Sequence, residues 1–439
     1  MKRLAGVAAL LAFPAFFLAG QEYSPVRYDT KAEIMADITK ASGEYRLYDF
    51  DLPAPTPPPR GYKPFYITHY GRHGSRYALS DKVYEGMKQV LEKARADGKL
   101  TPAGEELCRN YLAFYPRVAF RGGELTRKGQ EQHRRIAALM YRDCRPVFKG
   151  KTHVEAISTN SPRVLMSMAA FLDELGDLDK SLDAEFDAGR IYLPTLLPAS
   201  RESPAYRSGD ASMDAESKRD VFAGLLRTEA FCVRFFNDTG YLEANYGMRK
   251  FQNDLRTVIV DIPSLDFVPD CTFDGIFTDE ELYNLWKYRN YNGYLSMGRS
   301  PSGLAGACGA SASTVQELLA HAEEDIAGGR TQLRLRFGHD SGILPLLAFM
   351  RINSFGIETD DPEEVENYTR SFEITMAANV QFIFYRSRRN PEILVKCLFN
   401  GRNATLPFAP VEGPYYSWTA FKDYYAALCA AAAPSPSQN

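Results

Sequence analysis

The chain has 439 residues, of which 45% are hydrophobic and 24% charged, and its formal net charge is −3. This composition is typical of a soluble globular protein long enough for two domains, or for one large domain with an insertion. The slightly negative charge argues against a nucleic-acid partner held by a general basic field. Beyond the N-terminus no segment is long and apolar enough to span a bilayer, so no stable membrane insertion is predicted.

Residues 1–20 are predicted to be a secretory signal peptide. Lys2 and Arg3 precede an apolar run from Leu4 to Leu18, and Ala19-Gly20 supplies the small residues of a cleavage site. The run is too short for a membrane span, and polar sequence follows at once. We therefore expect export to the periplasm, the cell surface or the medium.

The seven cysteines do not predict a zinc site, because none shows the close paired spacing of metal ligands. Export to an oxidising compartment permits disulfides, and Cys108 and Cys144 are candidates for one pair. The odd number leaves at least one thiol unpaired. No metal or other cofactor is predicted.

The first half of the chain predicts strands that alternate with helices. Residues 21–60 form a lead-in that ends in the proline-rich run 53–59. Thr126 is a candidate N-cap, and Pro162 fits the first turn of a helix. The predicted elements are strands at 65–69 and 154–158, and helices at 83–94, after Thr126 and at 162–175.

The segment 179–305 differs from its surroundings and is interpreted as a helical insertion, because Gly, Pro, Ser and Tyr clusters separate its helical pieces. Asn400-Gly401 is a turn signal after the last strand. The elements predicted after the insertion are a strand at 333–337, a helix at 343–350, and strands at 380–385 and 393–399.

The fold class that follows is α/β, a doubly wound and mostly parallel sheet with helices on both faces and an inserted helical cap. The predicted organisation is a signal peptide at 1–20, a core in two parts at 21–178 and 306–439, and a cap at 179–305.

Three loops that directly follow predicted strands carry the candidate active-site residues. Such loops meet at the carboxyl edge of a parallel sheet. The first reads Tyr-Gly-Arg-His-Gly-Ser-Arg-Tyr and sets a histidine between two arginines, and the third reads Gly-His-Asp-Ser-Gly. The candidate residues are Arg72, His73 and Arg76 in the first loop, Arg163 after the second strand, and His339 and Asp340 in the third loop.

These side chains fit phosphoryl transfer. Guanidinium groups match phosphate oxygens in a bidentate way, so the three arginines, together with His339, are predicted to hold a phosphate. His73 is the candidate nucleophile that accepts the phosphoryl group. Asp340 is the candidate acid for the leaving alkoxide, and then the base that activates water. The guanidiniums supply the positive charge, so no metal is required.

On these residues the chain resembles the histidine phosphatase superfamily, in its acid phosphatase and phytase branch. The resemblance covers about residues 60–430. It implies an α/β core with a helical cap inserted before the His-Asp segment, and a phosphohistidine intermediate. The motifs that carry it are Arg72-His73-Gly74-Ser75-Arg76, Leu125-Thr126-Arg127-Lys128-Gly129, Arg163 in a Ser-Thr-x-x-x-Arg context, and His339-Asp340.

Within that branch the first loop, and Phe337-Gly338-His339 followed by Leu344-Pro345-Leu346-Leu347, resemble multiple inositol polyphosphate phosphatases. Phytate or another inositol polyphosphate is therefore the expected small-molecule substrate. Two features depart from that pattern. Ala78 stands where many members have proline, and Asp340 follows the histidine where many inositol polyphosphate phosphatases carry Ala-Glu. His321-Ala322-Glu323 falls within a helical run and is interpreted as a chance match.

Each candidate also has a simpler interpretation. His73 is then a structural loop histidine, Arg163 a helix-surface arginine, and Asp340 an N-cap carboxylate. Four basic residues of the predicted cap are either contacts for further phosphates or part of a solvated face: Arg201, Arg207, Arg249 and Lys250.

Three other functions compete with an inositol polyphosphate phosphatase: a broad acid phosphatase acting on sugar phosphates, a phosphoryl mutase, and a non-catalytic binder of phosphate ligands. The signal peptide argues against a mutase, since mutases are usually cytosolic. The complete set of candidate residues argues against a mere binder. The sequence indicates no oligomeric state.

Overall fold

The computed structural model of the protein describes residues 23–203 and 218–432, and the predicted signal peptide lies outside this part. Within these residues an eight-stranded sheet has the order β3-β2-β4-β1-β5-β6-β7, with β8 paired to β6. The strands are β1 (Tyr62–Arg72), β2 (His153–Ser158), β3 (Asp183–Ala188), β4 (Thr331–Gly338), β5 (Asn379–Ser387), β6 (Leu394–Phe399), β7 (Arg402–Asn403) and β8 (Tyr415–Ser417). Strands β3, β2, β4 and β1 run parallel, whereas β5 to β8 pair antiparallel.

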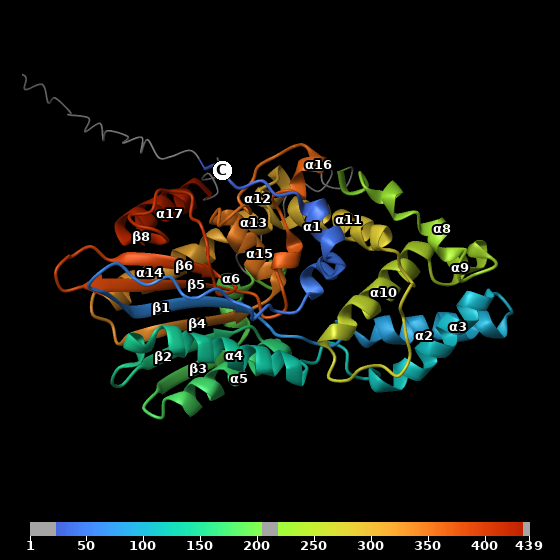
Figure 1. Ribbon diagram of the computed structural model, residues 1–439, viewed down its shortest axis with the longest axis horizontal. Coiled ribbons are helices and arrows are strands. Elements are labelled where there is room, and N and C mark those ends of the chain that lie inside the picture. The colour runs from blue at the N-terminus through green and yellow to red at the C-terminus, as the bar shows by residue number, and fades with distance from the viewer. Residues whose placement is uncertain (1–22, 204–217, 433–439) are drawn as a thin grey trace, which may run out of the picture.

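Helices cover both faces of the sheet, which confirms the predicted α/β fold (Figure 1). Helices α4 (Arg127–Asp143) and α5 (Pro162–Leu178) lie on one face, and α14 (Ala312–Ile326), α15 (Asp340–Phe349) and α17 (Trp418–Ala432) on the other. Each face of the sheet has its own hydrophobic core, and strand β5 contributes side chains to both. Phe382 and Phe384 pack on the α14 side, whereas Ile383 and Tyr385 pack on the α4 side, because successive side chains of a strand alternate between faces.

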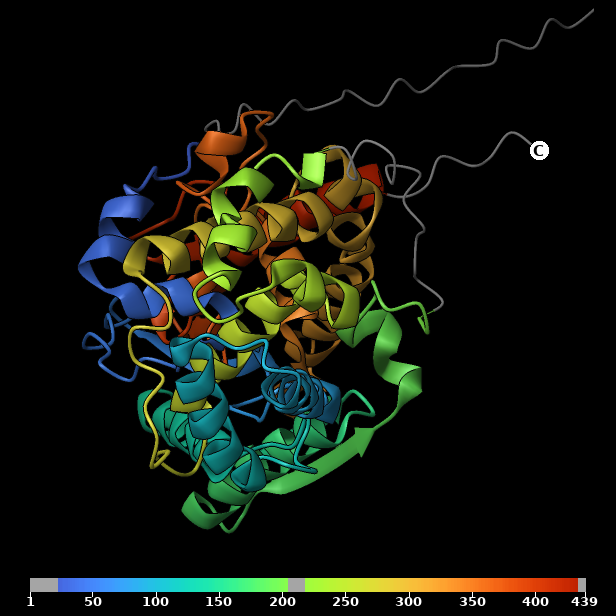
Figure 2. The ribbon, with the colours of Figure 1, turned by 90° about the vertical axis from the view of Figure 1, so that its right-hand side faces the viewer.

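A layer of helices lies beyond the carboxyl ends of the parallel strands, and Figure 2 looks onto it. We call this layer the cap. Its helices are α2 (Asp81–Ala96), α3 (Pro102–Phe114), α8 (Thr228–Cys232), α9 (Thr239–Asn245), α10 (Met248–Asp261) and α11 (Asp279–Met297). These helices come from two separate parts of the chain, 81–114 and 228–297. One hydrophobic cluster joins them, and it contains Met87 and Leu107 from the first part and Phe251 and Leu255 from the second.

The cap therefore differs from the predicted insertion at 179–305 in two ways. Helices α2 and α3, from before the second strand, belong to the same hydrophobic cluster as the later helices. Strand β3, inside the predicted insertion, pairs parallel with β2 and forms the edge of the sheet, so the sheet continues past the predicted boundary at residue 178. Its sequence, Asp-Ala-Glu-Phe-Asp-Ala, is polar and largely exposed, and so lacks the apolar pattern of a buried strand.

Local sequence signals set the ends of the elements around the site, as predicted. The Thr126 side chain caps α4 by accepting a hydrogen bond from the backbone N–H of Gly129, at 3.1 Å. Pro162 occupies the first turn of α5. Asn400 and Gly401 both have positive φ, 49° and 74°, in the tight turn between β6 and β7.

Shorter helices connect these elements: α1 (Thr30–Ala36), α6 (Leu193–Leu196), α12 (Pro301–Ala305), α13 (Ala307–Ala310), α16 (Pro362–Val365), and the 3₁₀ segments η1 (Ile38–Tyr45), η2 (Tyr115–Arg117), η3 (Arg145–Phe148), η4 (Arg190–Tyr192), η5 (Ala223–Leu226), η6 (Ile262–Ser264) and η7 (Ser371–Glu373). In the part of the chain that is described, no helix has the length and apolarity of a membrane span. All seven cysteines are free thiols, and Cys108 and Cys144 lie in different hydrophobic clusters, so the candidate disulfide is not formed.

Candidate active site

The three predicted loops meet where β1, β2 and β4 end, as the parallel order β2-β4-β1 requires. The backbone N–H of His73 donates to the carbonyl oxygen of Gly338 at 3.0 Å. The imidazole rings of His73 and His339 lie edge to face, with centroids 5.7 Å apart. Residues far apart in the chain thus form one site below the cap.

His73 is held as a neutral imidazole with one nitrogen available. Its side chain is buried, and Nδ1 lies 2.9 Å from the carbonyl oxygen of Gly74. A carbonyl can only accept, so Nδ1 carries the hydrogen and Nε2 keeps its lone pair. Burial, and then the charges of Arg72, Arg76 and Arg163, lower the pKa of His73 well below 6.5. The imidazole therefore stays unprotonated, and nucleophilic, in acidic solution.

The three arginines around His73 share one feature: the Nε–H of each is buried and has no hydrogen-bond partner in the structure. Their orientation is fixed through other atoms. Nη1 of Arg72 donates to the carbonyl oxygens of Ile374, at 2.8 Å, and Thr375, at 3.1 Å, and also to that of Glu44. A buried N–H group without an acceptor is unfavourable. Arg351 and Arg370, elsewhere in the fold, share this feature, so what is specific to the site is that three guanidinium charges act on His73, which suits an oxyanion with several oxygens.

Asp340 lies against this cationic group. Its carboxylate accepts from Nη2 of Arg72 at 2.9 Å and from the backbone N–H of Ser341 at 2.8 Å. Burial acts to raise the pKa of Asp340, but the guanidiniums of Arg72 and Arg76 outweigh burial and hold the pKa at about 2. Asp340 is thus ionised before a ligand binds. A phosphate dianion on the same arginines would raise this pKa, because it adds negative charge and competes for Arg72.

His339 is engaged through both ring nitrogens. Nδ1 lies 3.3 Å from Nη2 of Arg163, and Nε2 lies 3.1 Å from Oγ1 of Thr159. Because an arginine can only donate, Nδ1 accepts and Nε2 carries the hydrogen. Burial and the charge of Arg163 lower the pKa of His339 to about 4. In this state His339 orients Arg163, and a phosphate oxygen would have to replace Thr159 as acceptor for the predicted phosphate contact to form.

Sequence reasoning missed Asp261 at the end of cap helix α10. Its carboxyl is 1% exposed, and neither oxygen has a hydrogen-bond partner in the structure. Burial raises the pKa of Asp261 to about 7, although Arg76 and Arg72 act to lower it. No motif surrounds this residue, and only the packing of the cap over the first loop brings it to the site.

A close contact between two backbone segments fixes the first loop. A Cβ on Gly74 would lie 2.3 Å from the carbonyl oxygen of Gly129, and a Cβ on Gly129 would lie 2.2 Å from that of Ser75. The hydroxyl of Thr126 also donates to the Ser75 carbonyl at 3.0 Å. The segment 125–129, noted in the sequence, therefore supports the loop from the start of α4.

The histidines outside the site have structural surroundings. His69 and His133 are buried, and burial lowers the pKa of each to about 3. His321 lies inside α14, as the helical run predicted, with Nδ1 at 2.8 Å from an oxygen of Glu317.

We compared the chain with protein-family models, with curated proteins and with solved structures. A family model described as the histidine phosphatase superfamily (branch 2) matches residues 71–400. No curated protein matched the chain. The crystal structure of Bifidobacterium longum multiple inositol polyphosphate phosphatase in complex with inositol hexasulfate superposes with a TM-score of 0.70 at 16% identity, over 88% of this chain and 98% of that one.

Two phytase structures are also similar. The phytase from D. castellii gives a TM-score of 0.62 at 16% identity, over 90% of this chain and 85% of that one. The Hafnia alvei phytase in complex with tartrate gives 0.54 at 12% identity, over 85% and 99%. At these identities the likeness shows a shared fold.

Proposed function

Because the chain belongs to branch 2 of the histidine phosphatase superfamily, we propose that it is an exported phosphomonoesterase that hydrolyses phytate or another inositol polyphosphate through a phosphohistidine, without a metal. The observation that supports this function is the convergence of the guanidinium donors of Arg72, Arg76 and Arg163 on the buried, neutral imidazole of His73. The donors match the oxygens of a phosphoryl group, and the imidazole supplies the nucleophile.

The reaction has two steps. The arginines hold the equatorial oxygens while Nε2 of His73 attacks phosphorus and the ester P–O bond breaks. The leaving alkoxide takes a proton from Asp340, whose pKa the bound phosphate has raised. Water then attacks the phosphohistidine and gives its proton to Asp340. Inorganic phosphate leaves, and His73 returns to its neutral form.

The low pKa of His73 fits an acid phosphatase. A nucleophile with an ordinary histidine pKa would be largely protonated below pH 6. Here burial and three guanidiniums keep the imidazole neutral, so the nucleophile remains competent in acidic solution.

The substrate class is supported by the fold neighbours, one of which was crystallised with inositol hexasulfate. One observation favours a broader acid phosphatase acting on sugar phosphates. Arg249 is paired with Asp220 at 3.2 Å and Lys250 with Asp254 at 2.5 Å, so neither is free for a further phosphate in this state. Of the other two basic residues predicted in the cap, Arg201 is exposed and Arg207 lies outside the described residues.

The test is phosphate release from phytate and from glucose 1-phosphate, with products followed over time, with and without a chelator. We expect turnover of phytate that the chelator does not affect, and a phosphohistidine at His73 in rapidly quenched enzyme. His73→Ala should abolish turnover, whereas the control His321→Ala should retain it. Absence of phytate turnover would exclude the preferred substrate. Substantial activity of His73→Ala would reject the nucleophile.

A further inference from the structure

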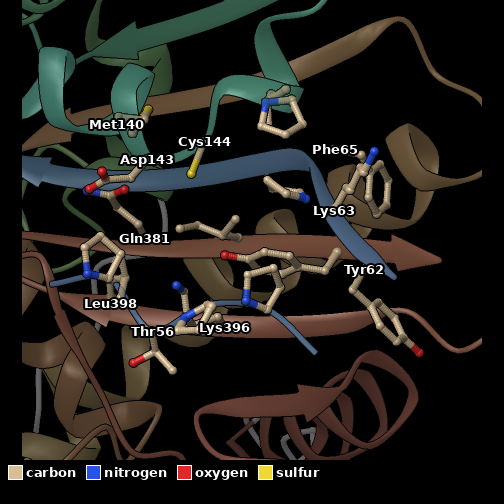
Figure 3. Close-up of a pocket in the computed structure, with 18 of the residues that line it drawn as sticks. Thr56, Tyr62, Lys63, Phe65, Met140, Asp143, Cys144, Gln381, Lys396 and Leu398 are labelled. Carbon is tan, nitrogen blue, oxygen red and sulfur yellow. The ribbon is translucent and has the colours of Figure 1, made fainter. Parts of the chain in front are cut away.

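A large cavity lies at the opposite end of β1 from the catalytic residues. Its volume is about 1420 Å³, and strands β1, β5 and β6 form its floor (Figure 3). Tyr62, at the start of β1, lines the cavity, and Arg72, at the end of β1, belongs to the active site. The strand register puts Lys396, on the cavity floor, level with Ile67 of β1, roughly 17 Å along the strand from Arg72. No step of the phosphatase reaction uses this cavity.

The walls of the cavity combine apolar and polar surface in about equal parts. One wall is the segment 52–58, part of the proline-rich run in the sequence. It is held at Thr56, whose carbonyl oxygen accepts from the hydroxyl of Tyr415 at 2.9 Å and whose Oγ1 accepts from Nδ2 of Asn403 at 2.7 Å. Prolines offer no N–H, so this wall presents mainly apolar surface. Met140, on α4, lines the facing wall.

Lys396 places a positive charge on the floor of the cavity. It stands on β6, is 4% exposed and points toward the cavity (Figure 3). Among the described residues its ammonium group makes no hydrogen bond or ion pair. It lies near the rings of Tyr385 and Tyr415, whose centroids are 5.7 and 5.5 Å from Nζ.

Among the titratable groups that act on the pKa of Lys396, only Asp143 carries a negative charge at pH 7, and it makes no ion pair with Nζ. Burial raises the pKa of the Cys144 thiol and of the Tyr415 hydroxyl to about 12, and that of Tyr385 above its ordinary value, so all three are neutral at pH 7. Asp143 is already bound by Arg142, at 2.6 and 3.0 Å. Burial correspondingly lowers the pKa of Lys396. Nζ of Lys396 is not among the enclosed polar atoms that lack a partner, so it is open to the cavity and an anion there could bind it directly.

The rim of the cavity adds to the positive field. Nine of the residues that line the cavity are Lys or Arg and only Asp143 is acidic, in a chain whose net charge is −3. Such a concentration of one charge in a concave surface attracts anions. The rim cations are Arg60, Lys63, Lys149, Arg386, Arg388 and Arg389.

We propose that this cavity is a second binding site, for an amphipathic organic anion. One carboxylate, sulfate or phosphate group binds Lys396, and an apolar body lies between the proline-rich wall and Met140. The volume suffices, since ligand sites typically measure about 300–1,000 Å³ and combine apolar walls with a few polar groups. A small inorganic anion would leave the apolar walls in contact with water, so it fits this cavity less well.

Fluorescence titration with 1-anilinonaphthalene-8-sulfonate, an aromatic sulfonate, tests this site on the folded enzyme. We expect saturable binding of one probe per chain. Lys396→Met should weaken binding about 10- to 100-fold, the effect of losing one charged hydrogen bond. Lys396→Arg should retain binding, and so should the control Lys422→Met, which removes an exposed ammonium on α17. All three variants should keep wild-type phosphatase activity.

Thermal melting adds a readout that does not depend on the probe. Without ligand, Lys396→Met should melt at or above the wild-type temperature, because burial of the side chain disfavours the charged ammonium. Competition identifies the body of the anion: displacement of the probe by decanoate supports an alkyl ligand, and displacement by 2-naphthoate an aromatic one. Equal affinity of Lys396→Met and wild type would overturn the site, as would displacement of the probe by inositol hexasulfate alone.

Discussion

Replacing Asp261 by asparagine should make the protein more stable at neutral pH and change it little in acid. In the unfolded chain the carboxyl ionises near its ordinary pKa of 3.8, whereas burial raises its pKa to about 7 in the folded protein. For an acid whose folded pKa is raised, the penalty is absent below the unfolded pKa, grows as the pH rises, and levels off above the folded pKa. Three pKa units at about 1.4 kcal/mol each make this penalty about 4 kcal/mol.

Urea unfolding of wild type and Asp261→Asn, at about pH 4.5 and about pH 7.5, measures this penalty. The stability gained by the variant should be about 3 kcal/mol larger at the higher pH. Asparagine is a close isostere of the protonated acid, so packing differences cancel between the two pH values. Asp270→Asn, at a side chain that is 98% exposed, should show no such pH dependence. An advantage of Asp261→Asn that is the same at both pH values would refute the raised pKa.

Three further predictions concern the candidate active-site loops. The acid limb of kcat/KM, from a pH–rate profile on phytate, should lie well below pH 6.5, because burial and the arginines lower the pKa of His73; an acid limb near 6.5 would contradict this. Asp340→Asn should slow phytate hydrolysis by about 10²-fold or more, but should slow hydrolysis of p-nitrophenyl phosphate far less, since that leaving group needs no proton; equal losses would refute the acid role. Gly74→Ala should lower the free energy of unfolding by at least about 3 kcal/mol, because its Cβ would meet a backbone carbonyl at 2.3 Å. Gly176→Ala, where a Cβ meets nothing within 4 Å, should instead stabilise α5 by about 1 kcal/mol; similar unfolding curves for the two would contradict the contact.

The sequence predicted the parts of the fold that local patterns control. The buried strands before Arg72, at 154–158 and before Gly338 have apolar runs, and each ends in a loop with chemically distinctive residues. Because strands of this type share one carboxyl edge, the three loops could be placed together without coordinates.

What the sequence could not predict depends on packing between distant segments. Strand β3 is polar because it lies at the sheet edge, so it has no buried pattern. Helices α2 and α3 pack into the cap through a hydrophobic cluster. Their amphipathic pattern predicts a buried face but does not identify the helices that cover it. Two residues of the candidate site that the sequence did not single out, Asp261 and Thr159, differ in whether a sequence motif surrounds them. Thr159 stood within a motif that pointed to the arginine four residues later, whereas Asp261 has no motif, and its pKa follows only from burial under the cap.

The backbone carbonyls that hold Arg72 affect both ligand affinity and the interpretation of mutants. Carbonyl oxygens from η1 and from the segment 374–375 accept hydrogen bonds from Nη1 of Arg72 in the absence of substrate. The side chain therefore loses little rotational freedom when a phosphate binds its other nitrogens. The same hydrogen bonds connect the N-terminal lead-in and the C-terminal half of the chain to strand β1. An Arg72 variant would therefore lose tertiary cohesion together with affinity, and its kinetics would report on catalysis only if its native structure were shown to be intact.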